Sequence, residues 1–171
     1  MCKFLPIDSN NINSYPILHY IPHIKKCLLK YRKYFWDDFV DINDFYELLF
    51  SKCPFLYVIA KYDGDFAGFA YLDNFIGSGK KLYSAELTTC FDKKAWGDFT
   101  RYSAKFFLKK CFDELNLEKI KAQIYPDNFR VRKLLTDCGF EFESLLKNET
   151  LRGGKMQDIE VYGLYRSYYY K

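Results

Sequence analysis

The part of this chain that most constrains its fold is a predicted strand–helix–strand unit in the second half of the sequence. Leu82–Phe91 is β-prone, an amphipathic helix is expected from about Phe99 to Leu115, and Lys119–Tyr125 alternates strictly between polar and apolar residues. Strands joined by a helix in this way pair in parallel through a right-handed crossover. We therefore expect these two strands to lie side by side and in parallel.

The helix within this unit has an apolar face and a basic edge. Its apolar residues recur at helical spacing, so we expect that face to pack on the sheet. They are Ala104, Phe107, Leu108, Cys111 and Leu115, and the opposite edge carries Arg101, Lys105 and Lys109. The basic edge is either a contact for an anionic ligand or an ordinary solvated face.

The residues before this unit predict a strand, two helices and a hairpin. We expect a strand at Lys3–Asp8, a helix that begins near Pro22, and a short helix from Asn43 or Asp44 to about Lys52. The first helix carries one apolar stripe, made of Ile24, Cys27, Leu28, Tyr31 and Phe35. Two β-prone runs, Phe55–Tyr62 and Phe66–Leu72, flank the turn Asp63-Gly64-Asp65 and predict the hairpin.

The residues after the unit predict a helix and a closing hairpin. The helix opens at Asn128 and ends at Gly139, a residue typical of helix C-termini. Two strands, about Glu141–Leu151 and Met156–Arg166, then flank the Gly153-Gly154 turn. This order predicts an α/β fold in which residues 1–171 form a single domain with a mixed central sheet and helices on both faces.

Composition narrows the classes of protein without naming one. The chain has 171 residues, 49% hydrophobic and 28% charged, which is a globular balance. Its net charge of +4 permits an anionic ligand such as a nucleotide cofactor but does not indicate a nucleic-acid binder. The start of the sequence lacks the apolar core of a signal peptide, and no apolar run approaches the length of a membrane span. We therefore expect a cytoplasmic protein with no membrane segment.

The cysteines and histidines do not indicate a metal site. Six cysteines are dispersed without a CxxC pair, so we interpret them as small buried hydrophobes in a reducing compartment, with a disulfide framework as the alternative. His19 and His23 share helical spacing, but Pro22 lies between them and no glutamate accompanies them. We expect no metal ligands.

Three ordered motifs carry a resemblance to a known family. Ala95-Trp96-Gly97 opens the long helix, Asn128 precedes a helix that ends in Gly139-Phe140, and Arg152-Gly153-Gly154-Lys155 with Asp158 marks the last hairpin. Together they resemble the GNAT superfamily of N-acetyltransferases, especially its ribosomal-protein N-terminal acetyltransferase-like branch and phage-encoded relatives. The resemblance implies a GNAT-like fold, in which the two parallel strands splay at their carboxyl ends and leave a V-shaped cleft. It also implies acetyl-CoA as cofactor, and transfer of its acetyl group to an amine of a protein or small molecule.

The resemblance also implies roles for particular residues. Glu86 stands where many relatives place a general base, and Asn128 matches a cofactor-contacting asparagine. Alternatively, Glu86 is a solvated or ion-paired strand carboxylate and Asn128 is a helix cap. The expected contacts with the pantetheine arm and pyrophosphate are Thr88, Thr89, Cys90, Lys94, Trp96, Gly97, Asp98, Phe99, Thr100 and Arg101.

Two departures from the family pattern leave other functions open. In the pyrophosphate loop, Phe99 and Arg101 occupy the positions of two small residues, so Phe99 either blocks the site or points into the core. The tyrosine that serves many relatives as general acid is Leu135 here. A GNAT-like binding or assembly module that has lost catalysis is therefore the second hypothesis. The third hypothesis is a transferase that acts on charged tRNA, and only the net positive charge of the chain suggests it.

Overall fold

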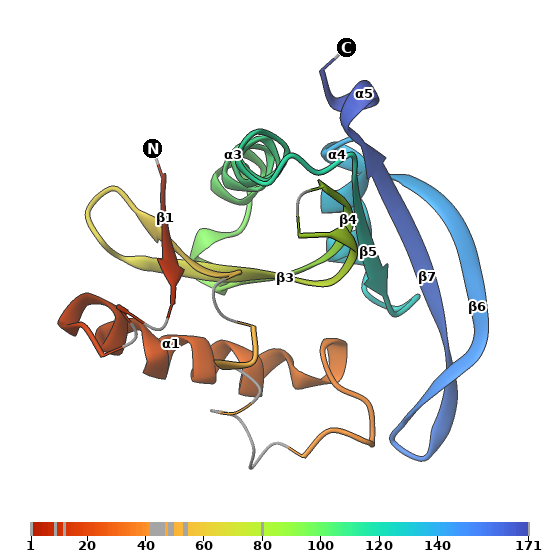
Figure 1. Ribbon diagram of the computed structural model, residues 1–171. Coiled ribbons are helices and arrows are strands. Elements are labelled where there is room, and N and C mark those ends of the chain that lie inside the picture. The colour runs from red at the N-terminus through yellow and green to blue at the C-terminus, as the bar shows by residue number, and fades with distance from the viewer. Residues whose placement is uncertain are drawn as a thin grey trace.

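The computed structural model describes residues 2–8, 10–11, 13–41, 47, 50–52, 55–79 and 81–170. Seven strands form one sheet in the order β1-β2-β3-β4-β5-β7-β6 (Figure 1). They are β1 (Cys2–Ile7), β2 (Leu56–Lys61), β3 (Phe66–Ser78), β4 (Lys81–Phe91), β5 (Lys119–Ile124), β6 (Glu141–Arg152) and β7 (Lys155–Tyr165). Neighbouring strands are antiparallel, except that β4 and β5 are parallel. The predicted mixed α/β sheet is confirmed.

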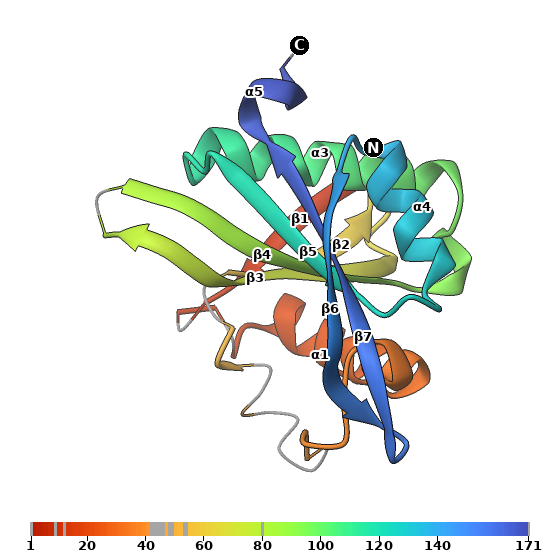
Figure 2. The same cartoon turned by 90° about the vertical axis from the view of Figure 1, so that its right-hand side faces the viewer.

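Helices lie on both faces of this sheet. α1 (Tyr15–Tyr31) covers one face and continues into a short 3-10 turn, η1 (Arg32–Tyr34). α3 (Asp98–Glu114), which follows the 3-10 turn η3 (Lys93–Ala95), covers the other face together with α4 (Phe129–Asp137), as Figures 1 and 2 show. A four-residue helix, α5 (Arg166–Tyr169), follows β7. The short helix expected between Asn43 or Asp44 and Lys52 falls mostly outside the described residues.

The first helix begins earlier than the sequence indicated. We expected it to start near Pro22, but α1 begins at Tyr15, has a proline in its first turn and contains Pro22 in its interior. An interior proline removes one helical hydrogen bond. The apolar stripe, however, extends upstream of Pro22, because Ile17 and Ile21 are both buried. Burying these side chains on the sheet offsets the missing bond.

Two apolar cores, one on each face, fix the helices to the sheet. The core under α3 and α4 includes Phe107 and Phe112, both almost fully buried, together with Ile120 of β5. The core under α1 includes Ile24 and Phe69. Of the residues predicted on these buried faces, Ile24, Cys27, Leu28, Phe107, Leu108 and Cys111 are buried. Tyr31, Phe35, Ala104 and Leu115 are only partly buried.

The parallel contact between β4 and β5 is very short. Ser84, Ala85 and Glu86 pair with Lys119, Ile120 and Lys121, and the ladder stops there. β4 continues to Phe91 and β5 to Ile124 without pairing to each other, although each keeps its other neighbour, β3 or β7. The expected splaying of these strands is therefore confirmed, and α3 is the crossover that joins them (Figure 2).

The closeness of β3 and β4 at Gly68 generates a stability prediction. A Cβ at Gly68 would lie 2.3 Å from the Cys90 carbonyl oxygen and 3.0 Å from the Phe91 Cα, and neither backbone atom can move without disturbing the sheet. We expect Gly68→Ala to lower the free energy of unfolding by about 1–3 kcal/mol, the usual cost of overpacking. Chemical denaturation measures the change. Gly79→Ala is the matched control, because nothing lies within 4 Å of its Cβ. Equal stability of the two variants would contradict the prediction.

Candidate active site

A large cavity opens where β4 and β5 separate. Its volume is about 930 Å³, and it passes between the two strands, so its walls come from both faces of the sheet. The starts of α3 and α4 line it on one face, and the segment after α1, with parts of β3 and β6, lines it on the other. This position makes the cavity the candidate active site.

Glu86 lies at the point where the parallel ladder ends. Its side chain lines the cavity, and its Oε2 accepts hydrogen bonds from Asn74 Nδ2 at 3.1 Å and Gln123 Nε2 at 3.0 Å. Both donors are neutral amides, so the carboxylate is oriented without a cation. Its Oε1 makes no hydrogen bond with any described residue, which leaves this atom able to accept a proton from a molecule in the cavity.

The remaining residues of β4 extend the cavity wall. Thr88, Thr89 and Cys90 line the cavity, as expected for a stretch that runs along a bound ligand. Since β5 no longer pairs with this part of β4, backbone groups that point away from β3 lack a strand partner there. A hydrogen bond with Cys27, together with burial, raises the pKa of the Cys90 thiol far above its usual range. Cys90 is therefore a neutral wall residue and not a nucleophile.

The start of α3 presents backbone donors to the cavity. Gly97 lines the cavity with a φ of +103°, which L side chains rarely adopt, and no side chain caps the helix at this position. The first-turn N–H groups of a helix have no intrahelical partner, and the helix dipole makes this end attractive to anions. Trp96 beside it is fixed by a 3.1 Å hydrogen bond from its indole N–H to the Phe91 carbonyl oxygen.

Phe99 does not fill this site. Its side chain is half-buried against the core under α3 and α4 and is absent from the cavity wall, whereas Thr100 and Arg101 line the cavity. Thr100 donates its hydroxyl to the Ala95 carbonyl oxygen at 2.7 Å, which braces the loop from within. Of the two arrangements that the sequence left open for Phe99, the structure has the one in which it packs on the core.

The charged residues of this loop differ in their placement. Arg101 is ion-paired with Asp98 and lies 3.9 Å from Asp137. Asp98 is exposed and borders a second, shallower hollow together with Arg101. Lys94 is exposed outside the cavity wall. A further cation, Arg130 at the start of α4, lines the cavity with its guanidinium 4.0 Å from the centroid of the Trp96 ring.

Asn128 stands at the N-cap position of α4, but its side chain makes no capping hydrogen bond. It lines the cavity instead, so its amide is available to a ligand. The capping role was the alternative that the sequence left open, and the described contacts do not include it.

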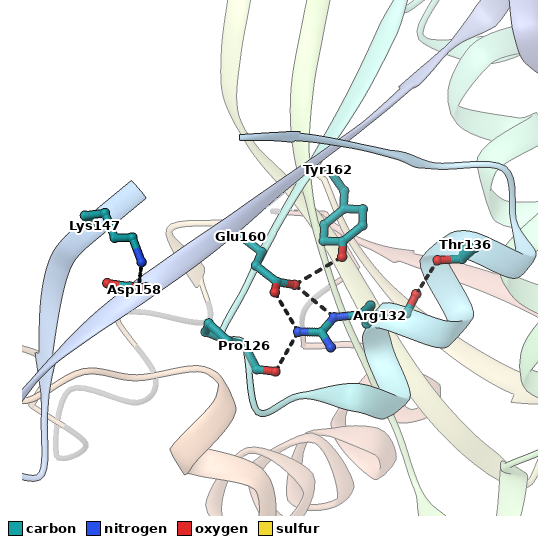
Figure 3. A network of polar contacts seen from close by, with 7 residues as sticks. All are labelled: Pro126, Arg132, Thr136, Lys147, Asp158, Glu160 and Tyr162. Atoms are coloured by element: carbon teal, nitrogen blue, oxygen red, sulfur yellow. Dashed lines mark hydrogen bonds and ion pairs between the residues drawn. The ribbon is translucent and has the colours of Figure 1, made fainter. Parts of the chain in front are cut away.

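A hydrogen-bonded network holds α4 against β7 (Figure 3). Because Asn128 immediately precedes α4, the network also limits where this residue can lie. Arg132 reaches Glu160 through two bonds, Nη2 to Oε1 at 2.6 Å and Nε to Oε2 at 3.0 Å, and donates from Nη2 to the Pro126 carbonyl oxygen at 2.7 Å. The Tyr162 hydroxyl donates to Glu160 Oε2 at 3.1 Å. A bidentate pair of this kind fixes orientation as well as distance.

A second set of contacts ties the segment after α1 to the β6–β7 hairpin. The Asp38 carboxylate accepts 2.8 Å hydrogen bonds from the backbone N–H groups of Gly154 and Gly153, which lower the pKa of Asp38. The Thr150 hydroxyl donates to Asp37 Oδ2 at 2.7 Å. These contacts close the wall of the cavity on the α1 face.

Several lining residues could not be identified from the sequence. The sequence indicates the position of Gln123 only in part: strict alternation places it on the polar face of β5, beside the cleft. No sequence signal marks Asp37 or Glu149. Four tyrosines line the cavity, Tyr31, Tyr34, Tyr71 and Tyr125, while Leu135 lines it without a hydroxyl. Burial raises the pKa of Tyr71 to about 12, so its hydroxyl keeps its proton at neutral pH.

The described residues contain neither a metal-binding cluster nor a membrane-spanning helix. No group of three or more His, Cys, Asp or Glu side chains among them is arranged to hold a metal ion. None of the described helices has the length and apolar character needed to cross a membrane. The five described cysteines are free thiols, and Cys53 lies outside the described residues.

The fold is similar to that of several solved acetyltransferases. A spermidine N-acetyltransferase from Vibrio cholerae, solved with CoA and spermine, superimposes with a TM-score of 0.73 at 20% identity, over 99% of this chain and 98% of that one. RimJ from Mycobacterium smegmatis, solved with CoA-disulfide, gives a TM-score of 0.72 at 18% identity, over 97% and 82%. At these identities the likeness concerns the fold.

The sequence comparisons identify the family. An uncharacterized N-acetyltransferase, p20 of Bacillus licheniformis, is 28% identical over 86 residues, which are 50% of this chain and 48% of that protein. The match thus spans about half the length of this relative. A family model described as an acetyltransferase (GNAT) domain matches residues 29–141, about two thirds of the chain. This protein therefore belongs to the GNAT acetyltransferase family.

Proposed function

We propose that the protein is an acetyl-CoA-dependent N-acetyltransferase that transfers an acetyl group to an amine of a protein or small molecule. One observation carries the proposal: the cavity between β4 and β5 joins Glu86 on the α1 face to the uncapped start of α3 on the other face. A proton acceptor and an anion-binding helix end therefore share one continuous space.

The residues present fit the cofactor. The uncapped first turn of α3 and the positive φ of Gly97 suit the pyrophosphate, since backbone N–H groups can approach it closely. Arg101 and Arg130 add positive charge at the same end of the cavity. The unpaired backbone edge of β4 from Thr88 to Cys90 suits the amide groups of the pantetheine arm.

The chemistry assigned to this chain is proton transfer and positioning. The acceptor nitrogen loses a proton to Glu86 Oε1 and forms a C–N bond with the acetyl carbonyl carbon, while the C–S bond of the thioester breaks. Gln123 and Asn74 hold the Glu86 carboxylate in place through its other oxygen. Acetyl-CoA supplies the activated acetyl group.

The donor of the proton that the departing CoA thiolate takes up is not Leu135, which has no hydroxyl. Tyr71 and Tyr125 line the cavity, and burial raises the pKa of both hydroxyls, so they remain donors at neutral pH. The missing tyrosine at position 135 is also what favours the second candidate, a GNAT-like binding or assembly module that does not turn over acetyl-CoA.

Three further features belong to this proposal. The motifs around Trp96, Gly139 and Gly153 support a place in the ribosomal-protein N-terminal acetyltransferase-like branch with its phage-type relatives. Residues 1–171 are proposed as one GNAT-like domain. The free thiols of the described cysteines suit a reducing compartment such as the cytoplasm.

Stabilisation by acetyl-CoA tests cofactor binding. A ligand that binds only the folded state adds about 2.7 kcal/mol at a hundredfold excess over Kd. At roughly 2–4 °C per kcal/mol, we expect millimolar acetyl-CoA to raise the melting temperature by several degrees. The measurement is a melting scan, repeated in moderate salt and accompanied by calorimetry. No shift and no heat of binding would contradict the enzyme hypothesis.

Two variants show whether the α3 loop causes that shift. Phe99→Ala should lower the melting temperature of the free protein and keep the shift, since Phe99 packs on the core and not in the cavity. Gly97→Val should reduce the shift, because a β-branched residue cannot easily hold a φ of +103° at the site where phosphate is expected. A larger shift in Phe99→Ala would mean that this ring obstructs the cofactor.

Substitution of Glu86 tests the proposed base. Glu86→Gln keeps an oxygen that can accept from Asn74 and Gln123, so we expect little change in stability. It removes the proton acceptor, so acetyl transfer should slow by about two to four orders of magnitude. CoA release measures the rate, and Glu141→Gln, an exposed position outside the cavity, is the control. Unchanged turnover in Glu86→Gln would remove this residue from the mechanism.

A further inference from the structure

The charged residues that line the cavity are sorted by the face of the sheet on which they lie. On the α3 and α4 face the lining cations are Arg101, Arg130 and Lys133, accompanied by Asp137. On the α1 face every charged lining residue is acidic, and these residues are Asp37, Asp73, Glu86 and Glu149. They come from four different elements, the segment after η1 and strands β3, β4 and β6, so the acidic half is built by the tertiary fold.

Strand alternation explains why two of these carboxylates lie on the same face of the sheet. Asp73 and Glu86 are direct partners in the β3–β4 ladder, so their side chains leave the sheet on the same face. Two like charges placed opposite each other are destabilising unless something compensates. Lys52 forms an ion pair with Asp73, with its Nζ 2.6 Å from Asp73 Oδ2. Lys52 itself is not part of the cavity wall.

The other three carboxylates have no cation among their described contacts. Glu86 is held by neutral amides, and Asp37 accepts hydrogen bonds from the Thr150 hydroxyl and the Phe39 backbone N–H. Glu149 is exposed at the cavity wall, and none of the described ion pairs includes it. This half of the cavity therefore holds three carboxylates that are not ion-paired with any described cation.

One observation independent of the carboxylates points to a cationic chain in the same space. The rings of Tyr34, Phe35 and Tyr71 line this half, and aromatic faces attract ammonium groups. Ammonium groups of this chain already lie over two of these rings: Lys33 Nζ is 4.5 Å from the centroid of Tyr34, and Lys52 Nζ is 5.2 Å from that of Tyr71.

We propose that the acceptor is an aliphatic amine that carries at least one further positive charge, a di- or polyamine. This inference rests on the proposed acetyl transfer and names the substrate class of the same cavity. The amine to be acetylated lies at Glu86, and the remaining ammonium groups lie among Asp37, Glu149 and the aromatic rings. An acceptor with a carboxylate beside its amine would meet repulsion here, so amino acids and acidic peptide N-termini are disfavoured.

Calorimetric titration of amines into the protein, with and without CoA, tests this assignment directly. CoA carries no acetyl group, so binding is measured without turnover. We expect spermidine to bind at least about tenfold more tightly than butylamine, since its extra ammonium groups add ion-pair and cation–π contacts. We expect the difference to shrink at about 0.5 M salt, because exposed charge pairs are screened. Equal affinity for the two amines would overturn the assignment.

Glu149→Gln tests whether spermidine binding depends on the acidic half of the cavity or only on the net charge of the protein. We expect it to weaken spermidine binding about two- to fivefold, the effect of one exposed ion pair, and to leave butylamine binding unchanged. Glu141→Gln is the matched control, because it removes the same charge from the same strand outside the cavity. If both variants weaken spermidine equally, the acidic half does not select the acceptor and the assignment fails.

The same samples distinguish failure of this inference from failure of the proposed function. In one outcome, the protein binds acetyl-CoA and releases CoA quickly with a neutral or zwitterionic amine but not with spermidine. That outcome would support the proposed transferase and contradict the polycationic acceptor. In the other outcome, spermidine binding depends on Glu149 but the protein neither binds nor consumes acetyl-CoA. That outcome would support the polyamine site and contradict the proposed transferase.

Discussion

The structure depends on one constraint, the three-residue length of the parallel ladder between β4 and β5. After Glu86 and Lys121 the strands separate, because β4 stays paired with β3 while β5 stays paired with β7. Beyond that point no backbone pairing joins the two strands, and the cavity lies between them. The backbone groups released along β4 are then the polar lining of that cavity, and each needs a partner when water leaves.

Because the two halves of the sheet share so little backbone pairing, side chains hold them in register. Gln123 of β5 donates a hydrogen bond to Glu86 of β4 where the ladder ends, and Asp38, after η1, accepts two from the Gly153-Gly154 turn between β6 and β7. Both contacts join a carboxylate to donors in a fixed geometry, which sets angle as well as distance. The width of the cavity therefore depends on polar contacts at its two ends, while the two apolar cores set the stability of the fold.

Much of the fold could be predicted from residue spacing, and the failures have identifiable physical causes. Alternation and helix periodicity located β4, α3 and β5 to within about one residue, because these elements pack one apolar face on the sheet. The start of α1 was missed because Pro22 was interpreted as a start signal, whereas burial of Ile17 and Ile21 extends the helix past it. Lys119 was assigned to a polar face, yet it is 8% exposed and ion-paired with Glu143 at 2.6 Å, a tertiary contact that no local pattern contains.

The altered loop at the start of α3 illustrates how a departure from a motif can leave the space in front of a helix open. A pyrophosphate site of this type uses backbone N–H groups, so side chains matter only where they enter the space in front of the helix. Phe99 stands four and eight residues before Ser103 and Phe107, both buried, so helical geometry carries its ring toward the core. Arg101 belongs instead to the exposed row of Lys105 and Lys109. The helix that follows the loop therefore decides which of the two bulky residues lines the cavity, and that residue is the cation Arg101.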